Sequence, residues 1–159
     1  MNTKIKLKLK ELREFQKIYP ESHCGGSIGL MLHGIDLQRD LGNSDLDITT
    51  PDEIQVNNEV YEERSDGNDF DYCLKRDIPA TSYYVKFDIR VCPEPSFEVV
   101  EFEGYKYNVS RLKDILFWKN KYAKKDSKKH IEDLETIKTG KRPKPTVPSS
   151  YSEVDDLPF

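Results

Sequence analysis

The sequence lacks any long hydrophobic run. No apolar stretch approaches the roughly 20 residues that a membrane-spanning helix needs, and the lysine-rich first residues lack the apolar stretch of a secretory signal. These absences argue against an integral membrane protein and against an exported one. We therefore expect a soluble, cytoplasmic protein with no membrane partner.

Cysteine is also scarce. The three cysteines, Cys24, Cys73 and Cys92, are odd in number, widely separated and not in any metal-ligand spacing. This pattern argues against a disulfide framework and against a structural zinc site. We expect buried thiols or strand residues at these positions.

The length and composition fit one domain. A chain of 159 residues with 36% hydrophobic residues can bury a single core but hardly two independent ones, and it shows no internal repeat. We expect a folded core at residues 1–109, C-terminal helices packed on that core at residues 110–139, and a Pro/Ser-rich tail at residues 140–159.

The net charge of −4 is unevenly distributed. Residues 1–17 carry six Lys or Arg and two acids, residues 18–110 carry seven and nineteen, and residues 111–145 carry twelve and five. A basic surface beside an acidic site would suit a polyanionic substrate approaching bound metal. Solvated faces of lysine-rich helices would produce the same counts, and both interpretations stay open.

Helical spacing dominates the start of the chain. Ile5, Leu9 and Leu12 predict an amphipathic helix that ends before Tyr19, although the alternation of lysine and apolar residues from Lys4 to Lys10 would also fit a strand. We favour the helix.

A strand, a glycine turn and a helix are predicted next. A short strand around His23 and Cys24 leads into a glycine pair, and the following helix is expected to be capped by Ser27 and to end near Gly34. Its apolar face is formed by Ile28, Met31, Leu32 and Ile35.

The alternation of apolar and polar residues, together with helix-capping residues, predicts the remaining strands and helices. We expect a strand at "DLDITT", loops around residues 57–58 and at "RSDGND", a strand at "SYYVKFDIRVC" and a hairpin that turns at Glu103-Gly104. A helix capped by Ser110 should run to about Lys125, and another should begin at Asp126 or Ser127 and end before Gly140.

Two aspartates one residue apart carry the strongest chemical signal. On a strand, Asp45 and Asp47 point to the same side, so their carboxylates can share a divalent cation while Leu46 packs into the core. Mg²⁺ prefers such hard oxygen ligands. A two-metal site requires a third carboxylate on a neighbouring strand, and Asp88 in "VKFDIRV" is the candidate.

The glycine turn fits the same task. Gly25 and Gly26 would let the backbone approach a phosphate closely, the N–H groups that follow favour anionic oxygens, and Ser27 adds a hydroxyl donor. Alone, a glycine pair followed by serine commonly marks only a turn and an N-cap.

Taken together, these motifs resemble the DNA polymerase beta superfamily of nucleotidyltransferases. "GGSIGLMLHG", then Arg39, then "SDLDI" is similar to the minimal members that include the toxin component of the AbiE type abortive-infection systems. "ILFWKNKYAKKDSKKHIEDLETI" also resembles the helical segment of that branch, in which a basic residue precedes an aspartate by four, here Lys129 and Asp133. The resemblance covers roughly residues 20–138.

The resemblance implies an α+β fold with a mixed sheet flanked by helices, and transfer of a nucleoside monophosphate from a triphosphate to a hydroxyl acceptor. It implies a two-metal Mg²⁺ site at Asp45, Asp47 and Asp88. RNA or tRNA is the expected acceptor in a toxin-like or phage-conflict role, with a cognate antitoxin or another protein as partner. The nucleotide-binding residues expected are Gly25, Gly26, Ser27, Arg39, Ser44, Lys121 and Lys129.

Simpler roles compete at several of these positions. Arg39 would more readily pair with Asp36 or Asp40 than meet a phosphate. Lys129 and Asp133 would form an ordinary helical pair.

A basic stripe is expected only under one condition. Lys121, Lys125 and Lys129 share a face if one helix continues through residues 126–127, and otherwise they do not. We expect Trp118 and Tyr122 to pack on the sheet rather than stack on a base.

The two histidines near the glycine pair are expected to be structural. His33 lies near a helix end, and His23 precedes Cys24 on a strand. The competing function from another class is a catalytically inactive nucleotidyltransferase-fold module that binds nucleic acid or a protein partner.

Overall fold

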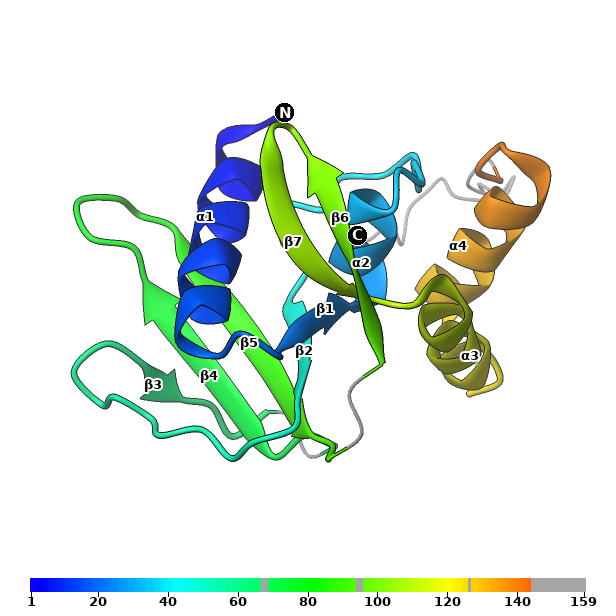
Figure 1. Ribbon diagram of the computed structural model, residues 1–159. Helices are drawn as coiled ribbons and strands as arrows, with labels where there is room; N and C mark the ends of the chain where they lie inside the picture. Colours follow the sequence, from blue (N-terminus) through cyan, green and yellow to red (C-terminus); the bar gives the residue numbers. More distant parts are fainter. Residues whose placement is uncertain (67–68, 94–95, 126, 144–159) are drawn as a thin grey trace.

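The protein folds as an α+β domain built on one mixed sheet, seen in a computed structural model that describes residues 1–66, 69–93, 96–125 and 127–143 (Figure 1). The predicted tail from residue 144 onward and the predicted helix start at Asp126 lie outside the described residues. Among the described residues, no helix combines the length and apolarity needed to cross a bilayer.

The sheet has seven strands in the order β3-β4-β5-β2-β1-β7-β6. Pairs β1–β7 and β2–β5 are parallel, and the other neighbours are antiparallel. The strands are β1 (His23–Gly25), β2 (Leu46–Thr50), β3 (Glu62–Glu63), β4 (Tyr72–Asp77), β5 (Tyr84–Val91), β6 (Phe97–Phe102) and β7 (Tyr105–Ser110). The helices are α1 (Thr3–Ile18), α2 (Gly26–Leu32), α3 (Leu112–Ala123) and α4 (Lys128–Thr139).

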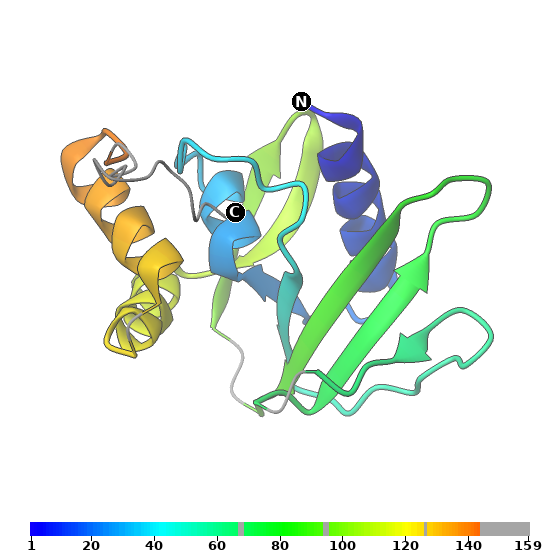
Figure 2. The same cartoon turned by 180° about the vertical axis from the view of Figure 1, so that it is seen from behind.

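Helices cover the sheet from both sides. Figures 1 and 2 show α1 on one face and α2 on the other, with α3 and α4 beside α2. The ring of Phe15 on α1 lies 5.7 Å from the ring of Phe87 on β5. Because successive strand residues face opposite sides, Asp88 points away from α1 and towards the α2 face.

Buried apolar residues alternate with polar residues along the two central strands β2 and β5. Leu46 and Ile48 on β2, and Phe87 and Ile89 on β5, are at most 2% exposed. They alternate with polar residues, so Asp47 and Asp88 share the opposite face, as predicted for Asp47. The packing of Leu46 in the core is confirmed.

Several predicted elements are confirmed. The first helix, the short strand before the glycine pair and the strand at residues 84–91 are present. The hairpin turns at Glu103 and Gly104, which both adopt positive φ angles, of 50° and 82°. No disulfide joins the three cysteines, all of which lie in the described chain; Cys24 and Cys73 are buried strand residues and Cys92 is half-buried.

Two capping predictions are wrong. Gly25, not Ser27, is the N-cap of α2, and Ser27 lies inside the helix with its hydroxyl bonded elsewhere. Arg111, not Ser110, precedes α3 as its N-cap. The Ser110 hydroxyl instead bonds the His23 ring, because β7 places it beside β1.

Two strands were not predicted. β4 pairs with β5 along its whole length, and β3 adds a short edge beside β4. The sequence of β4, with Lys75, Arg76 and Asp77 after an apolar start, has no regular alternation, because this strand lies near the sheet edge, where Lys75 and Arg76 are half-buried and Asp77 is exposed.

Candidate active site

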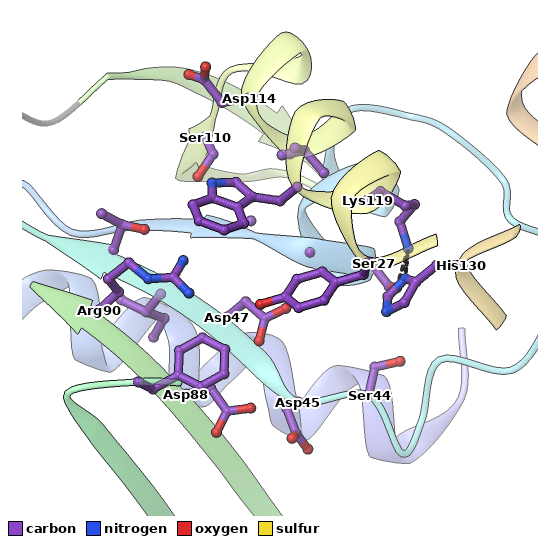
Figure 3. Close-up of a pocket in the computed structure, with 18 of the residues that line it drawn as sticks. Ser27, Ser44, Asp45, Asp47, Asp88, Arg90, Ser110, Asp114, Lys119 and His130 are labelled. Carbon is purple, nitrogen blue, oxygen red and sulfur yellow. Dashed lines mark hydrogen bonds between the residues drawn. The ribbon is translucent and has the colours of Figure 1, made fainter. Parts of the chain in front are cut away.

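Strand register aligns the glycine turn with two of the predicted acids. Gly25 on β1 lies opposite Asp47 on β2, and Asp47 lies opposite Asp88 on β5. Asp45 comes directly before β2, two residues from Asp47, so it reaches the same face. The three aspartates of the predicted site therefore lie beside one another on the α2 face of the sheet (Figure 3).

These residues line a cavity of about 720 Å³. Elements far apart in the sequence contribute to its wall, including the loop after α2 and both C-terminal helices. Nine predicted site residues are part of the lining: Gly25, Gly26, Ser27, Arg39, Ser44, Asp45, Asp47, Asp88 and Lys129.

Gly26 is required by its contact with Asp47. Its φ angle is +62°, which side chains other than glycine rarely adopt, and a Cβ at this position would overlap the Asp47 carboxylate. The glycine pair thus lets the start of α2 approach the carboxylate that the strand projects into the cavity.

Two of these carboxylates, those of Asp45 and Asp47, have unusually high pKa values. Burial, a hydrogen bond with Asp88 and repulsion from Asp88 raise the pKa of Asp45 to about 6. Burial, followed by repulsion from Asp88 and Asp45, raises the pKa of Asp47 to about 7. Removing like-charged groups from water raises their free energy, so this group of acids favours an added cation.

Arg64 supplies one positive charge to this group, and sequence reasoning missed it. Its Nη1 donates to Asp88 Oδ1 at 2.9 Å, and its Nη2 lies 3.7 Å from Asp45 Oδ2. Its Nε also donates to Asp66 at 2.9 Å. The side chain is only 10% exposed. Because Arg64 follows β3 in a segment predicted as loop, no local pattern marked it.

The donor chemistry of the three aspartates fits Mg²⁺, which prefers a few carboxylates completed by water and phosphate oxygens. Within the described ranges, however, no three His, Cys, Asp or Glu residues are grouped closely enough to hold a metal ion. Asp45 and Asp88 are engaged by Arg64. A divalent ion at these carboxylates would therefore compete with the guanidinium.

Across the cavity, a cluster of cations surrounds Asp133. This carboxylate on α4 is fully buried and accepts hydrogen bonds at 2.8 Å from Arg39, Lys119 and Arg142. Burial alone would raise the pKa of Asp133, but the bonds from Arg39, Arg142 and Lys119 hold it well below its usual value. Arg142 also pairs with Glu132, so three cations face two carboxylates and one positive charge remains in excess.

The cation cluster reaches the glycine turn through Ser27. The Ser27 hydroxyl accepts from Arg39 Nη2 at 2.8 Å and from Lys119 Nζ at 3.4 Å. The expected pairing of Arg39 with Asp36 or Asp40 is wrong, because α4 packs a buried carboxylate, Asp133, against it.

Lys129 and Lys121 occupy different surroundings. In the described chain Asp133 pairs with residues other than Lys129, which lines the cavity instead. Lys121 is not among the described lining residues, and its ammonium lies 4.9 Å from the Trp118 ring centroid. Since α3 ends at Ala123 and α4 begins at Lys128, the stripe that required one continuous helix does not form.

Trp118 and Tyr122 line the cavity, and the expected packing on the sheet is confirmed for Trp118, whose ring lies against Arg90 of β5. Trp118 is 36% exposed, and its ring lies 4.4 Å from the Arg90 guanidinium carbon. The ring of Tyr122 stacks on His130 at 5.3 Å.

The histidines near the glycine pair are both held by Ser110. His23 Nδ1 lies 2.7 Å from the Ser110 hydroxyl, and His33 Nε2 lies 2.7 Å from the Ser110 carbonyl oxygen. His23 lines the cavity, and burial lowers its pKa to about 4, so its ring is neutral at pH 7. Its buried Nε2 has no hydrogen-bond partner among the described residues.

Comparison with models of protein families, with curated proteins and with solved structures found no match to this chain. The cavity is acidic on the sheet, cationic at Arg39 and Lys119 beside Ser27, and aromatic along α3.

Proposed function

We propose that this protein is a Mg²⁺-dependent nucleotidyltransferase, which moves a nucleoside monophosphate from a triphosphate to a hydroxyl acceptor as pyrophosphate leaves. One observation supports it above the others. The three aspartates line the same cavity as Arg39 and Lys119 of the cation cluster and as Ser27, and in Figure 3 Lys119 and Ser27 lie to one side of Asp47. Attack on a phosphorus atom needs such an arrangement of anionic metal ligands and phosphate-binding cations.

Each group has a distinct role in this proposal. Lys119 and Arg39 bind phosphate oxygens with the charge that Asp133 does not neutralise. Asp45 and Asp47 would hold Mg²⁺, which would neutralise charge on the phosphates. Asp88 would join them as the third ligand where the ion displaces Arg64, and its carboxylate would accept the proton of the acceptor hydroxyl.

The acceptor and the biological role are proposed on the resemblance alone. RNA, including tRNA, is the acceptor class, and a toxin-like or phage-conflict role with a cognate antitoxin is the setting. Lys129 lines the cavity, and its positive charge is compatible with a bound nucleic acid.

The test is transfer of label from each α-³²P nucleoside triphosphate, with Mg²⁺, to total RNA, tRNA and the protein itself. We expect transfer by the wild type and a loss of about 10²-fold or more in Asp45→Asn/Asp47→Asn, on the scale of a catalytic electrostatic group. Asp77→Asn, on β4 with a side chain 80% exposed, is the matched control and should remain active. Equal transfer by wild type and double variant would refute the proposal.

A second candidate, an inactive module that only binds, is favoured by Arg64. Its guanidinium engages Asp45 and Asp88, and a protein without metal could keep that pairing permanently. Titration of Mn²⁺ by calorimetry separates the two candidates. The enzyme requires binding that depends on Asp47 and tightens in Arg64→Gln, whereas the inactive module requires no metal binding in either protein.

A further inference from the structure

Arg90 has hydrogen-bond donors that no described residue uses. Its side chain leaves β5 two residues after Asp88 and therefore reaches the same face of the sheet. Its guanidinium carbon lies 5.0 Å from the Phe70 ring centroid and 4.4 Å from that of Trp118. Within the described residues, Arg90 makes no ion pair and no side-chain hydrogen bond. The two rings orient the guanidinium and leave the donors in its plane available.

The aromatic lining continues along α3. Tyr122 lies one helical turn after Trp118, with ring centroids 6.2 Å apart and planes 32° apart. Both rings line the cavity, and Trp118 is 36% exposed. Tyr122 is half-buried and its ring also stacks on His130, so the accessible parts of the two rings form a stacking platform for a flat aromatic ligand.

The position of Arg90 separates it from the phosphate-binding cations. In Figure 3, Arg90 lies on one side of Asp47, while Lys119 and Ser27 lie on the other. A triphosphate held by Lys119 and Arg39 would leave Arg90 for a different part of a nucleotide. The flat fork of a guanidinium matches two neighbouring acceptor atoms on one edge of a base.

We propose that Trp118, Tyr122 and Arg90 form a nucleobase site that selects guanine or cytosine, the bases with two adjacent acceptors on one edge. Guanine offers O6 and N7, and cytosine offers O2 and N3. Adenine and uracil place a donor beside each acceptor of the corresponding edges, so the Arg90 fork meets at most one acceptor. This inference deepens the proposed function and rests on it for the identity of the ligand as a nucleotide.

Trp118 is the one tryptophan of the sequence, so its fluorescence reports binding at this site directly. We would titrate wild-type protein without Mg²⁺ with GTP, CTP, ATP, UTP and inorganic tripolyphosphate, and confirm each dissociation constant by calorimetry. We expect GTP and CTP to bind about 10-fold more tightly than ATP and UTP, on the scale of one bidentate arginine contact. Tripolyphosphate should leave the fluorescence unchanged.

Variants assign the effect to the proposed residues. Arg90→Met should abolish the preference among bases, and Tyr122→Leu should weaken all bases about 10-fold through lost stacking. Lys121→Met is the matched control, because its ammonium lies near the Trp118 ring but outside the described cavity lining, and it should keep the preference. Each variant's melting temperature verifies that it is folded.

Two outcomes would overturn the inference: no preference among the four bases, whether offered as free triphosphates or in short single-stranded RNAs, or the same Trp118 quenching by tripolyphosphate. Preference shown by short single-stranded RNAs but not by free triphosphates would support the site and assign it to the base of the acceptor. Base preference without label transfer would refute the proposed enzymatic activity and support the base site. Label transfer without base preference would support the enzymatic activity and refute the base site.

Discussion

Gly26 and Asp47 lie so close together that a methyl group on Gly26 would overlap the Asp47 carboxylate. The contact follows from the pairing of β1 with β2, in which Gly25 lies directly opposite Asp47. Because of this contact, the position of the Asp47 carboxylate in the cavity depends on the backbone conformation of the glycine turn.

Gly26→Ala should therefore damage both stability and activity. A side chain at φ +62° and a displaced Asp47 together should lower the free energy of unfolding by about 2–4 kcal/mol. Gly34→Ala is the matched control, since Gly34 also has a positive φ, of 87°, but a Cβ there would meet no atom within 4 Å. It should cost only about 1 kcal/mol and leave label transfer intact, as measured by urea denaturation and the transfer assay.

Asp47→Asn should stabilise the metal-free protein at high pH. The folded-state pKa is about 7, above the value near 4 of an unfolded aspartate, so the folded state holds the extra proton between these pH values. Stability is then full below pH 4 and falls as the pH rises through 7. The variant should exceed wild type by about 1–2 kcal/mol at pH 8 and match it at pH 4, after a discount for partial exposure. Denaturation at the two pH values tests this, and a constant difference would contradict it.

Asp133→Asn should be strongly destabilising. The change leaves Arg39, Lys119 and Arg142 around a neutral amide, and breaking a buried ion pair costs about 3–5 kcal/mol. Because the folded-state pKa of Asp133 is depressed, its contribution is complete above the unfolded value near 4 and declines as the pH falls further. The variant should thus lose stability at pH 7 and show less additional loss on acidification than wild type.

Glu132→Gln is the comparison for that variant. Glu132 pairs with Arg142 at 3.2 Å, but its side chain is 24% exposed, so the change should cost less than about 1 kcal/mol. Similar losses in both variants would show that Asp133 is not the centre of the cluster.

Lys8→Met tests a residue that supports the site from outside the cavity. The buried Lys8 ammonium donates to the carbonyl oxygens of Gly42 and Ser44, just before Asp45. Burial lowers the pKa of this lysine. Removing the donor leaves two carbonyl groups unpaired and should cost about 1–3 kcal/mol and reduce label transfer. Lys10→Met, on the exposed side of the same helix, should change neither stability nor transfer.

Local signals were sufficient for several elements. The spacing of Ile5, Leu9 and Leu12 predicted α1 because a helix packed on one side repeats its apolar residues every three or four positions. The Glu103-Gly104 turn and the face of Asp47 follow from similarly local rules. The same rules could not predict the contact of Arg64 with Asp88 or the formation of β4, because both depend on contacts with another strand, β5.

The sequence by itself determined the order of most helices and strands, and the face of β2 on which Asp47 lies. Only the tertiary structure decided that Arg39 pairs with Asp133, 94 residues away, and that Trp118 and Tyr122 face the cavity. The physical reason is that periodicity and capping act within a few residues, whereas charges and rings find their contacts through packing between elements distant in the chain.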